Sequence, residues 1–307
     1  MDMPRPYRGA EDMQAMLELL QRGWVANNGS YYIHPGDLKW WLYYPPLEGD
    51  LWEQIYLWDD LTQPGKILGW ALLSLHRVGF DVYVQPELRG TPQAESMYTW
   101  AEEQSLKIAR SRGKPTIYVE WKWHDDSVLS EHYKQRGYRS GRGYVHLRRT
   151  LEGVIPSPEL EPGYVVRGCH GTAEVAERAL AQYGAFGSLA PFEQYQRRFT
   201  SFMHSPVYAP DLDIVAVAAD GRVGAFCLVW PDRASKVGLF EPVGTHPIFQ
   251  RRGLGKAVML EGLRRMKELG MKLAIVSTFE DNPAAIRLYE SVGFRVINRL
   301  GTYEKDV

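Results

Sequence analysis

The sequence predicts a mixed α/β protein built from two domains in tandem. Its 307 residues are about twice the length of a common single domain. The same order of strand-like and helix-like segments occurs once in each half, and segment 150–163 between them holds three prolines and two glycines, as a linker does. We therefore predict one domain at residues 1–151 and a second at residues 152–307.

Each half is expected to begin with a strand that turns into an amphipathic helix, because apolar residues recur there at helical spacing. These strand and helix pairs are 7–9 with 10–21 and 166–168 with 173–182. Apolar runs typical of strands follow, and Asp220-Gly221 forms a hairpin turn between two of them. The runs are 67–75, 214–219 and 223–230.

Both halves continue with an X-Pro turn, a long helix that ends at a glycine, and an apolar strand. The turns are Gln85-Pro86 and His246-Pro247, the helices 93–110 and 255–269, and the strands 116–121 and 272–278. Each half then closes with a helix, a glycine and an aromatic residue, at 133–138 and at 289–294. The match in order supports two copies of one unit.

Charge and composition exclude several classes of partner. With 36 basic and 37 acidic side chains, no global field favours nucleic acid or an anionic membrane. The N-terminus has no apolar stretch typical of a signal peptide, so a cytoplasmic location without a membrane partner is expected. Cys169 and Cys227 lack metal-ligand spacing, no metal site is expected, and Cys227 is predicted to be a buried free thiol.

The segment 241–257 carries the most chemistry. A strand is expected to end near Thr245 and a helix to begin near Gly255, so unpaired N–H groups and the positive end of a helix dipole meet there. Glycines let the backbone approach an anion closely. Positive charge comes from Arg251, Arg252 and Lys256.

Two other phosphate motifs do not fit this turn. Ala257 stands where a P-loop needs Ser or Thr, and Val258 stands where a dinucleotide fingerprint needs its third glycine. A glycine-rich turn with exposed arginines remains the alternative to an anion site.

Two segments of the C-terminal half resemble the signatures of the GNAT superfamily of acyl-CoA-dependent N-acyltransferases. QRRGLGKA at 250–257 is similar to Q/R-x-x-G-x-G/A, and NPAAIRLYESVGF at 282–294 is similar to N-x-x-A-x-x-x-Y-x-x-x-G-F. The resemblance covers about residues 237–300. It implies that each domain is a mixed, largely antiparallel sheet flanked by helices.

The resemblance also implies an acetyl-CoA site. Amides of the turn would hold the pyrophosphate, and the strand ending at 243–245 would pair with the pantetheine arm. Asn282 precedes a helix, so it is an N-cap candidate as well as a CoA contact. The residues expected to bind acetyl-CoA are Val243, Gly244, Thr245, Gln250, Arg251, Arg252, Gly253, Leu254, Gly255, Lys256 and Asn282.

Two residues are candidates for acid–base catalysis. By resemblance, Tyr289 protonates the leaving thiolate, which a phenol with a pKa of about 10 can do; a core tyrosine is the alternative. Glu241 is the candidate general base, although a surface carboxylate, or one that pairs with Arg251, is equally consistent with its position. His204 and His246 are weaker rivals for the base.

The predicted function is acetyl-CoA-dependent N-acetylation of a small amine by direct attack in a ternary complex, with the active site in the C-terminal domain. The alternative is a non-catalytic acyl-CoA-binding sensor or regulatory module, which needs no proton donor such as Tyr289. The sequence leaves the acceptor and the oligomeric state open.

The N-terminal copy departs from the signatures at the positions that hold CoA. Proline has no N–H to donate, and an acidic residue repels a polyanion. Aligned on Pro86 and Pro247, the pairs are Arg89 with Gln250, Pro92 with Gly253, Ala94 with Gly255, Glu95 with Lys256, Asp126 with Asn282 and Tyr133 with Tyr289. We expect this half to have a structural role or to help form the substrate site, and not to be a second active site.

Aromatic residues gather before the first sheet strands of the N-terminal half. They are Trp24, Tyr31, Tyr32, Trp40, Trp41, Tyr43 and Tyr44. They are expected either to pack in a core or to line a substrate pocket. In the second half, segment 192–208 takes the same place, and by resemblance it would contact the acceptor. Arg197 and Arg198 favour an acidic acceptor or belong to a solvated helix face.

Overall fold

The computed structural model describes residues 3–27, 29, 32–45, 53–75, 77–123, 126–188 and 190–307. They form two compact units. Unit 1 lies within 1–34, 46–145 and 298–307, and unit 2 comprises 35–45 and 146–297. No helix in the described ranges is long and apolar enough to cross a membrane.

Unit 1 is a mixed sheet with helices, as predicted for the fold class. Its strands follow the order β1-β2-β3-β4-β5-β12-β6, in which β4 and β5 are parallel and β1 to β4 pair antiparallel. Its elements are β1 (Arg5–Pro6), α1 (Ala10–Ala26), β2 (Ile55–Asp59), β3 (Ile67–Ser74), β4 (Gly79–Val84), α3 (Pro92–Ser111), β5 (Thr116–Trp123), α4 (Ser127–Gln135) and parts of β6 (Arg139–Thr150) and β12 (Arg295–Asp306).

Unit 2 repeats this plan. Its strands follow the order β6-β11-β10-β9-β8-β7, with β10 and β11 parallel and β7 to β10 antiparallel. Its elements, besides parts of β6 and β12, are α2 (Pro35–Tyr43), β7 (Tyr164–Gly168), α5 (Val175–Phe186), α6 (Phe192–Met203), β8 (Asp213–Ala218), β9 (Val223–Asp232), β10 (Val237–Thr245), α7 (Leu254–Glu268), β11 (Leu273–Phe279) and α8 (Pro283–Ser291).

The expected helices exist, with shifts at their ends. Helix α1 runs five residues beyond the expected end at Gln21 and passes through Gly23. A Cβ at Gly23 would lie 1.7 Å from the hydroxyl oxygen of Tyr83, so only glycine lets the strand and the helix approach this closely.

The units exchange one segment in each direction. Residues 35–45 come from the N-terminal half of the chain but belong to unit 2, and residues 298–307 end the chain but belong to unit 1. The compact units therefore do not follow chain order. The predicted boundary between residues 151 and 152 stays a prediction about the two halves of the sequence.

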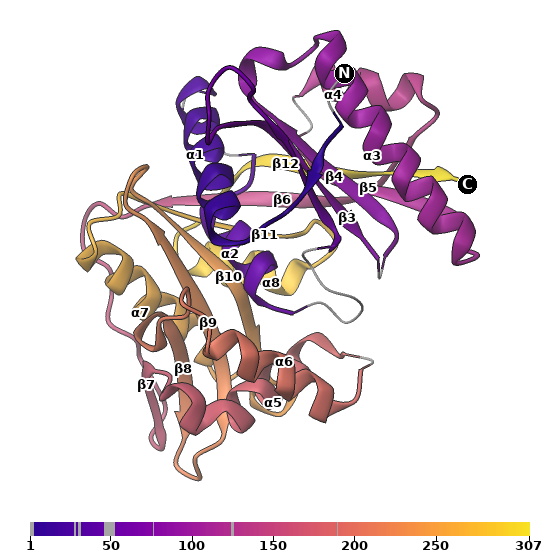
Figure 1. Ribbon diagram of the computed structural model, residues 1–307. Helices are drawn as coiled ribbons and strands as arrows, with labels where there is room; N and C mark the ends of the chain where they lie inside the picture. Colours follow the sequence, from indigo (N-terminus) through magenta and orange to yellow (C-terminus); the bar gives the residue numbers. More distant parts are fainter. Residues whose placement is uncertain are drawn as a thin grey trace. The chain divides into compact units, whose positions relative to one another are not determined.

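The end of the chain completes the core of unit 1. Strand β12 runs beside β5 (Figure 1), and Tyr303 pairs with Val119. The Tyr303 ring lies 5.2 Å from that of Tyr133, and its hydroxyl donates to Ser130 Oγ at 2.9 Å. Tyr303 is 7% exposed, so its burial stabilises the first unit from the last ten residues.

Truncating this side chain should destabilise unit 1. We expect Tyr303→Ala to lower the free energy of unfolding by about 3 to 5 kcal/mol, because it leaves a cavity and removes the hydrogen bond to Ser130 Oγ. Tyr303→Phe keeps the ring and should lose about 1 kcal/mol, the worth of one hydrogen bond. Denaturant unfolding measures both. Equal, small losses in the two variants would contradict the role of the strand in this core.

Candidate active site

The candidate site begins where two parallel strands of unit 2 part. The paired residues of β10 and β11 end at Leu239 and Ile275, although the strands continue to Thr245 and Phe279. The pairing of β10 with β9 is irregular between Phe240 and Val243. Past Leu239, β10 is no longer paired with β11, so its backbone N–H and C=O groups on that side need other partners.

The turn after β10 leads directly into α7. Arg251 and Gly253 adopt left-handed conformations, with φ of 63° and 73°. Helix α7 has no side-chain cap at its N-terminus, so its first N–H groups are left for an anion. The exposed side chains of Arg251, Arg252 and Lys256 surround this helix end, and Arg252 also donates to Tyr164 Oη at 2.8 Å.

Two glycines of this region are needed for close packing. A Cβ at Gly244 would lie 2.5 Å from the ring of Phe226, and one at Gly255 would lie 3.0 Å from Thr245 Oγ1. Gly244 therefore holds β10 against the helix layer behind Phe226. Gly255 lets the start of α7 approach the end of β10.

Asn282 caps the next helix. Its Oδ1 accepts from the Ala285 N–H at 3.2 Å, and its Nδ2 donates to Thr278 Oγ1 at 3.4 Å. The side chain thus joins the end of β11 to the start of α8. Its contact with CoA stays a prediction.

Glu241 lies at the irregular part of β10. Its backbone carbonyl accepts from Trp230 Nε1 at 2.7 Å, which fixes the chain at this point. Loss of water around the carboxyl, followed by repulsion from Asp37, raises its pKa to about 8. A carboxyl that titrates near neutral pH can accept a proton from an ammonium.

Tyr289 is placed by α8 and is 5% exposed. Burial, followed by the nearby charge of Glu241, raises the pKa of its phenol above the usual value. The phenol is therefore protonated at physiological pH and able to donate. Tyr289 is thus within electrostatic range of Glu241, and the roles of the two residues as acid and base stay predictions.

A model of the acetyltransferase (GNAT) family matches residues 176–294. The mycothiol acetyltransferase of Streptomyces coelicolor is 32% identical over 242 residues, which cover 75% of this chain and 73% of that protein. The chain belongs to the GNAT acetyltransferase family.

Other mycothiol acetyltransferases match over shorter spans. The protein of Nocardiopsis dassonvillei is 34% identical over 46% of this chain and 46% of its own length. That of Geodermatophilus obscurus is 32% identical over 56% of this chain and 58% of its own length. The chain thus spans about half the length of these two curated relatives.

Solved structures share the tandem GNAT fold. A tandem GNAT protein from the clavulanic acid biosynthesis pathway has a TM-score of 0.71 at 15% identity, covering 99% of this chain and 97% of its own. A GCN5-related N-acetyltransferase from Sphaerobacter thermophilus has a TM-score of 0.66 at 23% identity, covering 99% and 95%. At these identities the likeness shows the fold alone.

The rival bases of this GNAT protein have local partners. His246 Nδ1 accepts from the Ile248 N–H at 3.4 Å, and its ring packs where a Cβ at Gly184 would be. His204 Nδ1 contacts the Thr200 carbonyl at 2.9 Å. Both are used in turns or helix ends, which leaves Glu241 as the better candidate.

The predicted aromatic group divides between the units. Trp40 and Tyr44 pack in unit 2 on Phe202 of α6, with ring centroids 4.8 and 6.2 Å away. Arg198 lies 4.5 Å over the Tyr44 ring and donates to a carbonyl at the end of this segment, whereas Arg197 is exposed. These ring contacts hold α2 against α6 within unit 2. Tyr31 lies outside the described residues.

Sequence reasoning missed Asp37 of α2, whose charge acts on Glu241. It also missed a polar contact on β11 beyond the last residue paired with β10, where His146 Nδ1 lies 2.9 Å from Ser277 Oγ. Burial lowers the pKa of His146 to about 4, so it is neutral at physiological pH. No local motif marks these positions.

A buried ion pair supports the layer behind β10. Arg178 Nε donates to Asp213 Oδ1 at 2.8 Å, and neither side chain is exposed. The guanidinium lies 4.0 Å over Phe226, the ring that packs on Gly244. The pair thereby supports β10 at Gly244 through one aromatic ring.

Neither cysteine is placed for chemistry. Cys169 and Cys227 are free and buried, as predicted for Cys227, and burial raises the pKa of both thiols. Among the described residues, no group of three or more His, Cys, Asp and Glu side chains could hold a metal ion.

The raised pKa of Glu241 predicts a pH-dependent stability. Between pH 4.5 and 8 the folded protein keeps a proton that the unfolded chain has released, so folding stability falls as pH rises through this window. We expect Glu241→Gln to become more stable than the wild type by about 1 to 3 kcal/mol at pH 8, after allowance for partial exposure, and equally stable at pH 4.

Denaturant unfolding at several pH values measures this difference. Asp37→Asn should shift the transition in wild-type stability to lower pH, because it removes the like charge beside Glu241. Asp220→Asn, in an exposed hairpin of the same unit, is the matched control. Parallel stability curves for the wild type and Glu241→Gln would contradict the assignment.

Proposed function

We propose that unit 2 transfers an acetyl group from acetyl-CoA to a small amine by direct attack in a ternary complex. The observation that carries the proposal is the joining of three features in one unit: the parted strands β10 and β11, the uncapped basic start of α7, and the coupled pair of Glu241 and Tyr289. The first two fit a CoA thioester, and the third fits proton transfer.

The proposed donor site uses the strand end and the turn together. The pyrophosphate would lie at the N-terminus of α7, held by its N–H groups and by the three exposed basic side chains around it. The pantetheine amides would pair with the backbone of Val243–Thr245. The thioester would then point between β10 and β11, towards Glu241.

The proposed reaction is a balanced acyl transfer. The amine nitrogen attacks the thioester carbonyl carbon, a C–N bond forms and the C–S bond breaks. Glu241 accepts the proton that the nitrogen loses, directly or through water, and Tyr289 donates its proton to the departing sulfur. No covalent intermediate on the protein is required, because both cysteines are buried with raised pKa values.

Charge at the acceptor side supports an amine. Asp37 and Glu241 come from different segments and repel each other electrostatically, so an ammonium between them would relieve the repulsion. The matched relatives are named mycothiol acetyltransferases. Their acceptor therefore belongs in the first acceptor screen, beside simple primary amines.

Distorting the turn between β10 and α7 should greatly weaken acetyl-CoA binding. Gly253 has a φ of 73°, which proline cannot adopt, so Gly253→Pro should weaken acetyl-CoA binding at least 100-fold by displacing the N–H groups at the helix start. Arg251→Gly removes one charge from another left-handed position without straining the backbone, and should weaken binding by about 3- to 10-fold.

Calorimetric titration of acetyl-CoA into each folded variant measures these changes. Thermal unfolding confirms that the variants fold. Unchanged affinity in Gly253→Pro would show that the donor does not bind at this turn.

Removing the phenol should separate binding from chemistry. We expect Tyr289→Phe to lower kcat by about 10²- to 10⁴-fold while the Kd for acetyl-CoA changes less than threefold, since only proton donation is lost. Thiol release with an accepted amine measures kcat. Glu241→Gln should also lower kcat and should remove the rise of kcat/KM that the wild type shows up to about pH 8.

Two results would contradict this mechanism. Full turnover in Tyr289→Phe would exclude the phenol as the acid. Acetyl-CoA binding by the wild type without release of thiol to any amine of the screen would favour the acyl-CoA sensor.

A further inference from the structure

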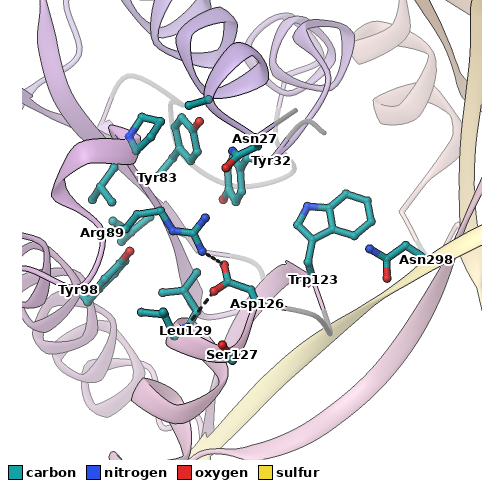
Figure 2. A pocket seen from close by; sticks show the side chains of 15 residues that line it. Asn27, Tyr32, Tyr83, Arg89, Tyr98, Trp123, Asp126, Ser127, Leu129 and Asn298 are labelled. Carbon is teal, nitrogen blue, oxygen red and sulfur yellow. Dashed lines mark hydrogen bonds and ion pairs between the residues drawn. The ribbon is translucent and has the colours of Figure 1, made fainter. Parts of the chain in front are cut away.

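Unit 1 contains a cavity of about 530 Å³ where its own parallel strands part. The paired residues of β4 and β5 end at Phe80 and Val119, and the cavity lies at the continuing ends of both strands. Figure 2 shows side chains from α1, β4, α3 and α4 around it. A cavity of this volume is large enough for a small organic ligand.

The turn beside this cavity is unsuited to a pyrophosphate. Thr91 caps α3 by accepting from the Ala94 N–H at 3.4 Å, so the amide that corresponds to that of Gly255 already has a partner. Pro92 has no N–H to donate. Glu95 in the first turn carries a negative charge and contacts His132 Nδ1 at 2.9 Å. The unit 1 cavity therefore selects against CoA.

Two ion pairs join the parted elements of this unit. Lys122 of β5 reaches Asp81 of β4 at 2.5 Å, and Tyr32 donates to the same carboxylate. At the cavity wall, Arg89 pairs with Asp126 (Figure 2). Each pair is neutral as a whole, so the cavity presents both signs of charge without a net field for an anion.

The Arg89–Asp126 pair keeps groups available for a ligand. Asp126 Oδ1 caps α4 by accepting from the Leu129 N–H at 3.2 Å, and Oδ2 faces Arg89. Arg89 uses Nη2 for this contact, which leaves the donors of its other edge. The side chains are 33% and 12% exposed and both line the cavity, so a ligand in it can reach both.

The opposite walls are aromatic. Tyr32 and Tyr83 stack with ring centroids 4.5 Å apart, and Trp123 also lines the cavity (Figure 2). The Tyr98 ring is 4% exposed, and its hydroxyl points towards the Arg89 side. Such walls favour a flat or apolar body over a hydrated chain.

We propose that this cavity is a second ligand site, which takes a small zwitterion with an aromatic body, of the aromatic amino-acid class. Its carboxylate binds the free edge of Arg89, and its ammonium binds Asp126. Its ring packs against Tyr32 and Trp123. A ligand with only a positive charge is repelled by Arg89, and a ligand with only a negative charge is repelled by Asp126. A molecule that carries both charges can pair with both side chains.

Titration of aromatic amino acids into the full chain tests the proposal. The probes are L-phenylalanine, L-tyrosine and L-tryptophan, with 2-phenylethylamine and 3-phenylpropanoate as analogues that carry one charge. We expect at least one amino acid to bind with one site per chain, and both analogues to bind at least 10-fold more weakly than L-phenylalanine, or than the tightest of the three probes.

Variants locate the site. Arg89→Gln and Asp126→Asn should each weaken binding at least 10-fold, and asparagine at 126 keeps the helix cap. Arg77→Gln breaks an exposed ion pair elsewhere in unit 1 and should leave binding unchanged. Glu241→Gln, in unit 2, should also leave it unchanged.

Each alternative outcome overturns the proposal. Failure of all three amino acids to bind excludes the ligand class. An affinity in Arg89→Gln equal to that of the wild type excludes Arg89 as a binding residue. Loss of binding in Glu241→Gln places the ligand in unit 2. Binding of a second acetyl-CoA per chain, retained in Gly253→Pro, makes this cavity a CoA site. Apart from loss of binding in Glu241→Gln, these outcomes do not bear on the acetyl transfer proposed for unit 2.

Discussion

The parting of two parallel strands is the constraint on which both proposed sites depend. In each unit, a parallel pair begins with regular partners and then separates, after Leu239 and Ile275 in unit 2 and after Phe80 and Val119 in unit 1. Backbone groups beyond that point need new partners, because an unpaired buried N–H or C=O is costly. A strand pair that parts thus creates a binding site, whose ligand is decided by the side chains nearby.

Packing on the sheet of unit 2 supports the end of β10. The buried Arg178–Asp213 pair tolerates burial because Tyr208 and Gln182 supply further hydrogen bonds. It presses Phe226 on Gly244, and so places the strand that would meet the donor. Helix α2 packs on β9 and β10 and brings Asp37 to the acceptor side. A segment of the N-terminal half therefore completes the chemistry proposed for the C-terminal half.

Local signals made much of this predictable. The start of α7 is coded by glycines and basic residues in one short segment, and Asn282 is a cap that precedes its own helix. The exchange of α2 and β12 could not be predicted, because it depends on contacts such as Trp40 with Phe202 between distant segments. The pKa of Glu241 could not be predicted either, since burial and Asp37 set it.

The two units show how one backbone plan serves different ligands. Where unit 2 has the neutral residues Gln250 and Asn282, unit 1 has Arg89 and Asp126, which neutralise each other. Where unit 2 leaves a helix start uncapped beside basic side chains, unit 1 caps it with Thr91 and places Glu95 in its first turn. The charge at the strand ends thus changes from attractive for a polyanion to balanced. Because the fold is the same in both units, this change in charge, and not the fold, distinguishes the proposed donor site from the proposed site for a small zwitterion.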